Sequence, residues 1–210
     1  IKSTIPPYYS IALGTEVASL YELVGAYGTF ANKGVHVEPY YVSRIEDKFG
    51  NVIYNEPPRK SRAISEDVAY VMLNMLQETA KSGSGRGLYF RYGLVDAKQE
   101  KNEIGAKTGT TQNASDGWFM AITQDLVAGA WVGGDDRAIH FKYWADGQGA
   151  RTAMPIVAQF MQKVYADSTL GIQKSFFDRP ADLSMEIDCQ KFTDIMSTSD
   201  STIIFDDEIY

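Results

Sequence analysis

The sequence of 210 residues contains one cysteine and only two histidines. The lone Cys189 excludes a disulfide within the chain and a metal site built on a cysteine cluster. His36 and His140 lie far apart in the sequence, so a histidine-rich metal site is not expected either. No apolar run approaches the roughly 20 residues that a membrane-spanning helix needs. These residues are therefore expected to hold no metal, to need no cofactor and to contain no membrane span.

An initiator methionine and a secretion signal are missing as well. The sequence opens on "IKSTIPPYYS", which has neither the basic start nor the apolar stretch of a signal peptide. We therefore expect the chain to be a piece of a longer protein, and no targeting signal within it indicates a cellular address.

The chain also lacks an excess of basic residues, with 20 lysines and arginines against 27 acids and a net charge of −7. Residues 166–210 hold ten of these acids and three bases, whereas residues 1–165 hold 17 of each. Binding to nucleic acid gains mainly from neutralising phosphates, so no nucleic-acid partner is expected. A hydrophobic share of 44% is enough for a globular core. We predict a body over residues 1–165 and an acidic C-terminal extension over residues 166–210, extended or partly ordered.

Three stretches show the apolar periodicity of α-helices. The first, residues 18–33, begins at a capping box of Ser19 and Glu22 and ends before Gly34. Its internal Gly25 and Gly28 weaken a helix, so they predict close packing against a neighbouring element. Its predicted apolar face consists of Leu20, Leu23, Val24, Tyr27 and Ala31.

The second and third helices are predicted over residues 65–81 and 153–165. Ser65 caps the second helix, and Pro155 is tolerated in the first turn of the third. The predicted apolar face of the second helix consists of Val68, Met72, Met75, Leu76 and Thr79. That of the third helix consists of Ile156, Val157, Phe160, Met161 and Val164.

Strand signals fall between these helices. Residues 40–54 read as a hairpin around the turn "DKFGN", and three further strands are predicted over about 102–110, 117–123 and 126–133. The last two strands are joined by the tight turn "TQD", so they are antiparallel. The chain is therefore predicted to have an α/β (α+β) fold, an antiparallel sheet flanked by helices.

The stretch "GAKTGTTQNASDG", residues 105–117, carries the most chemistry. A lysine beside small hydroxyl residues can hold a carboxylate through its charge and through hydrogen bonds. Glycine at position 109 allows a substrate backbone to approach, and an exposed strand edge offers N–H groups to a peptide. One such N–H, aimed at a carbonyl oxygen, makes half of an oxyanion hole. The triplet Lys107-Thr108-Gly109 on its own is more simply the end of a strand that runs into a polar loop.

The segments around this triplet favour an active site over a simple polar loop. The chain contains "FANKG" at the end of the first helix, "AKTGTTQNASDGWFMAITQDLVAGAWVGGDD" across the sheet, and "GARTAMPIVAQFM" before the last helix. Over residues 8–165 it resembles the carboxyl-terminal half of the transpeptidase domain of the class A (bifunctional) penicillin-binding proteins. The resemblance implies a five-stranded sheet of which this chain supplies about three main strands. It also implies a protein of the bacterial cell envelope, on the periplasmic face of the inner membrane, anchored by a segment further upstream.

The resemblance implies D,D-transpeptidation, in which a serine attacks the D-alanyl-D-alanine end of a peptidoglycan stem peptide; β-lactams acylate the same serine. Lys107 is then catalytic through its charge and its part in proton transfer, and the N–H of Thr110 is half of the oxyanion hole. The hydroxyls of Thr108 and Thr110 bind the substrate carboxylate, and Gly109 permits its approach. Thr111 is a weaker substrate-binding candidate.

The family pattern also needs a serine-x-x-lysine and a serine-x-asparagine, and the chain has neither. In the family both motifs lie upstream, so we expect this chain to be inactive alone. The strand over residues 126–133 loses its neighbours without the upstream strands, and an unpaired apolar edge invites association. The expected partner is the amino-terminal half of the same protein, with self-association as the alternative.

Two other functions stay open at this point. The chain could belong to a serine β-lactamase or β-lactam sensor of the same superfamily, or to a non-catalytic binding or structural module. The loop "GSGRG", residues 83–87, has the glycines of a phosphate-binding loop. It follows a helix, whereas the phosphate loop needs a strand before it, so we interpret "GSGRG" as the end of the second helix.

Overall fold

The computed structural model describes residues 1–14, 17–94, 101–188 and 191. Its centre is an antiparallel sheet of three strands in the order β5 (Gly105–Thr110), β6 (Asp116–Ile122) and β7 (Val127–Gly133). These are the three strands predicted from the sequence, within about three residues at each end. The α/β fold with an antiparallel sheet and flanking helices is confirmed.

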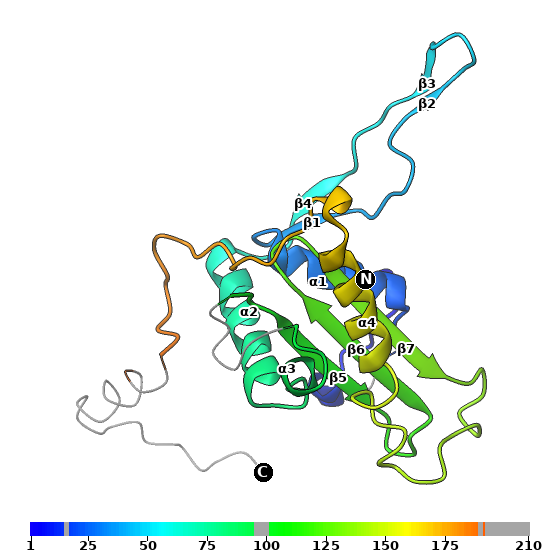
Figure 1. Ribbon diagram of the computed structural model, residues 1–210, viewed down its shortest axis with the longest axis vertical. Helices are drawn as coiled ribbons and strands as arrows, with labels where there is room; N and C mark the ends of the chain where they lie inside the picture. Colours follow the sequence, from blue (N-terminus) through cyan, green and yellow to red (C-terminus); the bar gives the residue numbers. More distant parts are fainter. Residues whose placement is uncertain (15–16, 95–100, 189–190, 192–210) are drawn as a thin grey trace.

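Helices cover both faces of this sheet (Figure 1). On one face, Phe119 of β6 is buried together with Met154 and Met161 of α4 (Met154–Ala166). On the other face, Ile122 of β6 is buried against α2 (Glu66–Lys81), and α1 (Leu20–Ala31) packs beside it. The alternation of β6 side chains between two helical layers explains why its sequence, "GWFMAIT", is apolar almost throughout.

The ends of α1 are as predicted. The Ser19 N–H donates to the Glu22 carboxylate at 3.0 Å, and the Glu22 N–H donates back to the Ser19 hydroxyl at 3.2 Å. Gly34 closes the helix with a φ of +82°, and its N–H donates to the Thr29 carbonyl at 2.8 Å. The packing expectation is right for Gly25, where a Cβ would lie 3.3 Å from the Pro39 side chain. It is wrong for Gly28, which has open space within 4 Å.

The buried face of α2 differs from the predicted one. Its buried residues are Ala69, Leu73, Leu76, Gln77 and Ala80. Val68 and Met75, which we placed on the buried face, are 39% and 60% exposed. The buried stripe contains two alanines and a glutamine beside its leucines, and the small Ala80 packs in one core cluster with Ala106 of β5. A count of large apolar residues misses such a stripe.

The same effect appears in α4. Val157, Met161 and Val164 are buried as predicted, but Ile156 and Phe160 are 54% and 50% exposed. Their place in the core is taken by Met154 and Ala158. The sequence thus predicted the helix and three of its buried residues, but it also assigned the exposed Ile156 and Phe160 to the buried face.

Small elements complete the fold. The strands β1 (Val35–Val37) and β4 (Lys60–Arg62) pair antiparallel next to α1. The predicted hairpin is confirmed as β2 (Ile45–Glu46) and β3 (Val52–Tyr54), and it projects from the body in Figure 1. One short helix, α3 (Gly87–Phe90), follows α2, and 3-10 turns occupy Tyr9–Leu13 and Ser168–Leu170. None of the helices described is long and apolar enough to cross a membrane.

Residues 171–188 carry no helix or strand, yet part of this segment is fastened to the body. Phe177 is buried against Leu73 and Leu76 of α2. The Glu103 N–H donates to the Ser175 carbonyl at 3.0 Å, and the Phe177 N–H donates to the Glu103 carboxylate at 2.7 Å. The division of the chain after residue 165 stays a prediction, and residues 189–190 and 192–210 lie outside the described part.

The two edges of the sheet are β5 and β7. In the described part of the chain, β7 pairs only with β6, so one of its edges has no strand neighbour. Its faces are covered, because Ala128 and Ala130 pack on the α4 side and Gly129 lies close to Leu20 of α1. The expected open edge is therefore present, while association through it stays a prediction.

Candidate functional site

The Lys107–Thr110 stretch lies on β5, at the edge of the sheet. The Thr111 N–H donates to the Asp116 carbonyl at 3.1 Å, across the pair of strands. The Ala106 carbonyl accepts from the Thr79 hydroxyl of α2, on the opposite side of β5. Backbone groups of successive strand residues alternate in direction, so Ala106, Thr108 and Thr110 direct theirs away from β6. The N–H groups of Thr108 and Thr110 therefore face the edge where a peptide could pair.

The hydroxyls of these two threonines are held by neighbouring loops. The Thr108 hydroxyl lies 2.7 Å from that of Ser84, which precedes α3. The Thr110 hydroxyl accepts a hydrogen bond of 3.1 Å from the Gly149 N–H, in the loop before α4. Each hydroxyl can donate one proton and accept elsewhere, so the pair can still donate to a bound carboxylate. The sequence named Thr108 and Thr110 but missed the loop residues that orient them.

The Lys107 side chain is exposed and carries no carboxylate partner within the described ranges. Its ammonium bends back to the Thr108 carbonyl at 2.5 Å. A charge without a paired acid, next to a strand edge with free N–H groups, suits the binding of an anion. The position of Lys107 thus agrees with an anion-binding edge, and its catalytic role stays a prediction.

Gly109 has a packing reason to be glycine. It lies directly opposite Trp118 in the pairing of β5 with β6, and a Cβ on Gly109 would come within 3.0 Å of the Trp118 Cβ. Trp118 in turn lies opposite Trp131 of β7, with the two ring centroids 6.3 Å apart. The tryptophans are thus part of the sheet packing, and approach of a substrate to Gly109 stays a prediction.

Thr111 organises the turn between β5 and β6. Its hydroxyl accepts from the N–H groups of Ser115 at 3.0 Å and Asp116 at 2.9 Å. Burial alone would raise the pKa of Asp116, but hydrogen bonds from the Ser115 hydroxyl and the Trp131 indole hold that pKa below its usual value. The substrate-binding role suggested for Thr111 is untested, and its observed partners belong to the turn.

Replacing Thr111 by valine is expected to lower the free energy of unfolding by about 1–3 kcal/mol, because the Asp116 N–H loses its acceptor and the Ser115 N–H keeps only its longer bond to the Asn113 side chain. Thr111→Ser keeps the acceptor and should stay within about 0.5 kcal/mol of the unchanged chain. Urea unfolding followed by tryptophan fluorescence measures both. Equal stability of the two variants would show that the turn does not depend on the hydroxyl.

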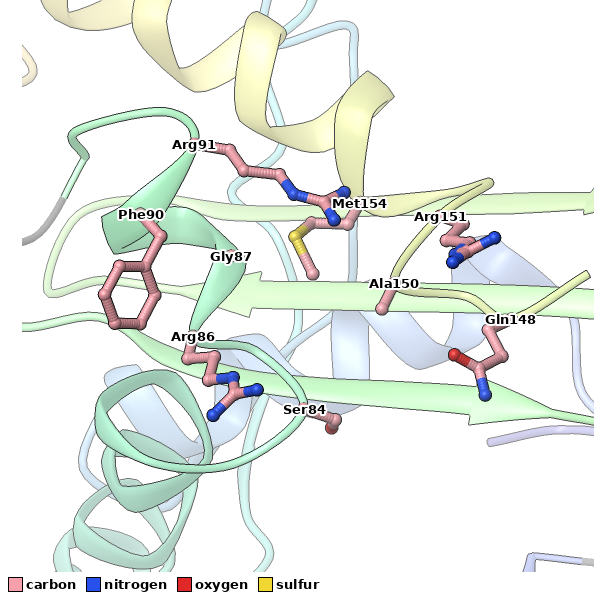
Figure 2. A pocket seen from close by; sticks show the side chains of 9 residues that line it. All are labelled: Ser84, Arg86, Gly87, Phe90, Arg91, Gln148, Ala150, Arg151 and Met154. Carbon is pink, nitrogen blue, oxygen red and sulfur yellow. The ribbon is translucent and has the colours of Figure 1, made fainter. Parts of the chain in front are cut away.

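A pocket of about 450 Å³ opens beside this edge. Figure 2 shows its lining, which comes from the "GSGRG" loop, α3 and the loop before α4: Ser84, Arg86, Gly87, Phe90, Arg91, Gln148, Ala150, Arg151 and Met154. The interpretation of "GSGRG" as a helix end is confirmed, since the Gly85 N–H donates to the Thr79 carbonyl at 2.9 Å. The contact between Ser84 of this loop and Thr108 was not predicted from the sequence. The glycines of the loop could have indicated its close approach to β5, because a Cβ on Gly85 would lie 2.9 Å from that of Ala106.

Comparison with known proteins gives the family. Residues 7–162 match the family described as penicillin binding protein transpeptidase domain. Penicillin-binding protein 1A of Aquifex aeolicus is 31% identical over 160 residues, which are 76% of this chain and 20% of that protein. Penicillin-binding protein 1A of Pseudomonas aeruginosa is 26% identical over 89% of this chain and 27% of its own length. The chain thus spans about a fifth to a quarter of these curated relatives.

Solved structures agree on the fold. The crystal structure of penicillin-binding protein 1A from Haemophilus influenzae superposes with a TM-score of 0.65 at 23% identity, over 82% of this chain and 29% of that one. The penicillin-binding protein PonA1 from Mycobacterium tuberculosis gives 0.60 at 22% identity, over 85% and 45%. With the family match covering most of its length, the chain belongs to the transpeptidase domain family of the penicillin-binding proteins and resembles penicillin-binding protein 1A.

Proposed function

We propose that this chain forms the substrate-binding wall of a serine-type D,D-transpeptidase that cross-links peptidoglycan stem peptides and reacts with β-lactams. The observation that carries the proposal is the edge of β5, where the Thr108 and Thr110 N–H groups point away from β6. A peptide that ends in D-alanyl-D-alanine pairs with this edge, and its carboxylate is held by the hydroxyls of Thr108 and Thr110. Gly109 leaves room for the peptide backbone.

The chemistry requires a serine from outside the chain. Its hydroxyl attacks the carbonyl carbon of the penultimate D-alanine, and the proton passes to a nearby base. The Thr110 N–H stabilises the oxyanion, and the Lys107 ammonium lowers the energy of the developing charge. The C–N bond then breaks, D-alanine leaves with a proton, and an amine of a second stem peptide takes the acyl group and releases the serine.

The nucleophile defines the partner. None of the serines in the sequence is followed by a lysine three residues later. We infer that the serine comes from an upstream half of the same protein, which adds strands at the free edge of β7; self-association through that edge is the alternative. The resemblance to proteins much longer than this chain supports this assembly. It also supports a periplasmic location with a membrane anchor upstream.

The chain by itself is expected to form no covalent adduct with penicillin, because it lacks the activated serine. Intact-mass spectrometry after incubation with fluorescent penicillin checks this. A transpeptidase domain that includes the upstream serine-x-x-lysine should gain the mass of one penicillin under the same conditions. An adduct on the chain alone, or its absence in the complete domain, would contradict the proposal. Rapid release of hydrolysed penicillin by the complete domain would favour a β-lactamase instead.

A further inference from the structure

The pocket beside β5 is unusually rich in cations. Three of its nine lining residues are arginines, and none is an acid. In Figure 2, the guanidinium groups of Arg86, Arg91 and Arg151 stand around one opening, with Met154 between them. A guanidinium is always charged and presents a planar fork of donors that matches a carboxylate. The pocket is therefore built to receive an anion.

Most N–H donors of these three arginines are not used in ion pairs within the described residues. Arg151 forms an ion pair of 2.8 Å with Asp146 through one nitrogen, which leaves other N–H groups of its fork unused. Over the ranges that the structure describes, Arg86 and Arg91 have no ion pair. Their charges are uncompensated at the pocket mouth, where Ser84 and Gln148 add uncharged polar groups. An arriving carboxylate thus meets donors that are not already committed to another acid.

The pocket adjoins the proposed peptide-binding edge through both threonines. Ser84, on one side of the pocket, contacts the Thr108 hydroxyl at 2.7 Å. On the other side, Gly149 lies between the lining residues Gln148 and Ala150, and its N–H donates to the Thr110 hydroxyl at 3.1 Å. A peptide whose terminal carboxylate sits at these hydroxyls therefore has the arginine pocket next to it, on the α4 side of the sheet.

We propose that Arg86, Arg91 and Arg151 form a second anion subsite, which binds a second carboxylate of the peptide held at the β5 edge. The inference rests on the proposed function, because that function supplies the peptide. The subsite selects for peptides with a free side-chain or branch carboxylate over the same peptides with an amide there. Exposed ion pairs are individually weak, so the selection comes from three guanidinium groups that line one pocket and amounts to about fivefold in affinity.

The test uses the chain and three fluorescein-labelled peptides. The first is glutamyl-alanyl-D-alanyl-D-alanine, the second is its glutaminyl counterpart, and the third is the glutamyl peptide with a C-terminal amide. Fluorescence polarisation should give a dissociation constant about fivefold lower for the first peptide than for the second. The double variant R86Q/R91Q should bind both equally. R44Q/R59Q, which removes two exposed arginines elsewhere and the same net charge, should keep the preference.

The subsite would be overturned by equal binding of the glutamyl and glutaminyl peptides, by a preference that survives R86Q/R91Q, or by no binding of either. Equal loss of the preference in R44Q/R59Q would also overturn it, because general charge would then explain the effect. The single variant R91Q guards against misfolding of the double variant. The amide peptide tests the proposed function separately. If it binds as well as the free acid, the carboxylate cradle at Thr108 and Thr110 is wrong, whatever the arginines do.

Discussion

Replacing Lys107 by alanine is expected to lower the rate constant of acylation by penicillin about 10²–10⁴-fold in a transpeptidase domain that contains this chain. The ammonium of Lys107 is exposed, lies on the edge strand proposed to bind the peptide and has no carboxylate partner in the described part. Under the proposed function, its charge is therefore available to the oxyanion and to proton transfer at the serine. Removing it takes away stabilisation at the point where negative charge develops, while an exposed side chain contributes little to folding.

Two further variants separate charge from proton transfer. Lys107→Arg keeps the positive charge but cannot release a proton near neutral pH. Recovery to within about tenfold of the original rate constant would assign Lys107 an electrostatic role, and a rate as low as that of K107A would assign it a proton-transfer role. Lys48→Ala, on the projecting hairpin, removes the same charge far from β5 and should leave the rate unchanged. Unimpaired acylation in K107A would remove Lys107 from the site altogether.

The sequence predicts the elements of this fold well because their signals are local. The Ser19–Glu22 capping box and the left-handed Gly34 each depend on a few neighbouring residues, and the structure contains both. The strands β6 and β7 follow from short apolar runs separated by a tight turn. Such features need no knowledge of what lies across the fold.

The buried faces and the partners in the site are not local. The buried face of α2 was predicted incorrectly because it holds the small residues Ala69 and Ala80, and Ala80 packs in one core cluster with Ala106 of β5. Ser84 and Gly149 touch Thr108 and Thr110 across 24 and 39 residues of sequence. The sequence motif identifies the strand that carries Thr108 and Thr110. The loops that orient their hydroxyls are distant in sequence and come close only in the folded structure.

Gly149 shows how much the site depends on such a contact between residues distant in sequence. It is expected that Gly149→Ala lowers the free energy of unfolding by about 3 kcal/mol, the upper end of the usual cost of overpacking, because the neighbouring atoms are backbone. A Cβ at this position would lie 2.1 Å from the Trp118 carbonyl oxygen and 2.8 Å from that of Gly109. Both oxygens belong to the paired backbone of β5 and β6, which cannot move without disturbing the sheet.

The loop must therefore move away, and the hydrogen bond from the Gly149 N–H to the Thr110 hydroxyl is lost with it. In a chain of this length the melting temperature should fall by about 6–12 °C. Gly28→Ala is the matched control, since Gly28 lies inside α1 with nothing within 4 Å, and it should raise the free energy of unfolding by up to about 1 kcal/mol. Differential scanning calorimetry compares the two variants. If G149A has the same melting temperature as the unchanged chain, the loop does not pack on β5 and β6, and Thr110 must be oriented by the strand alone.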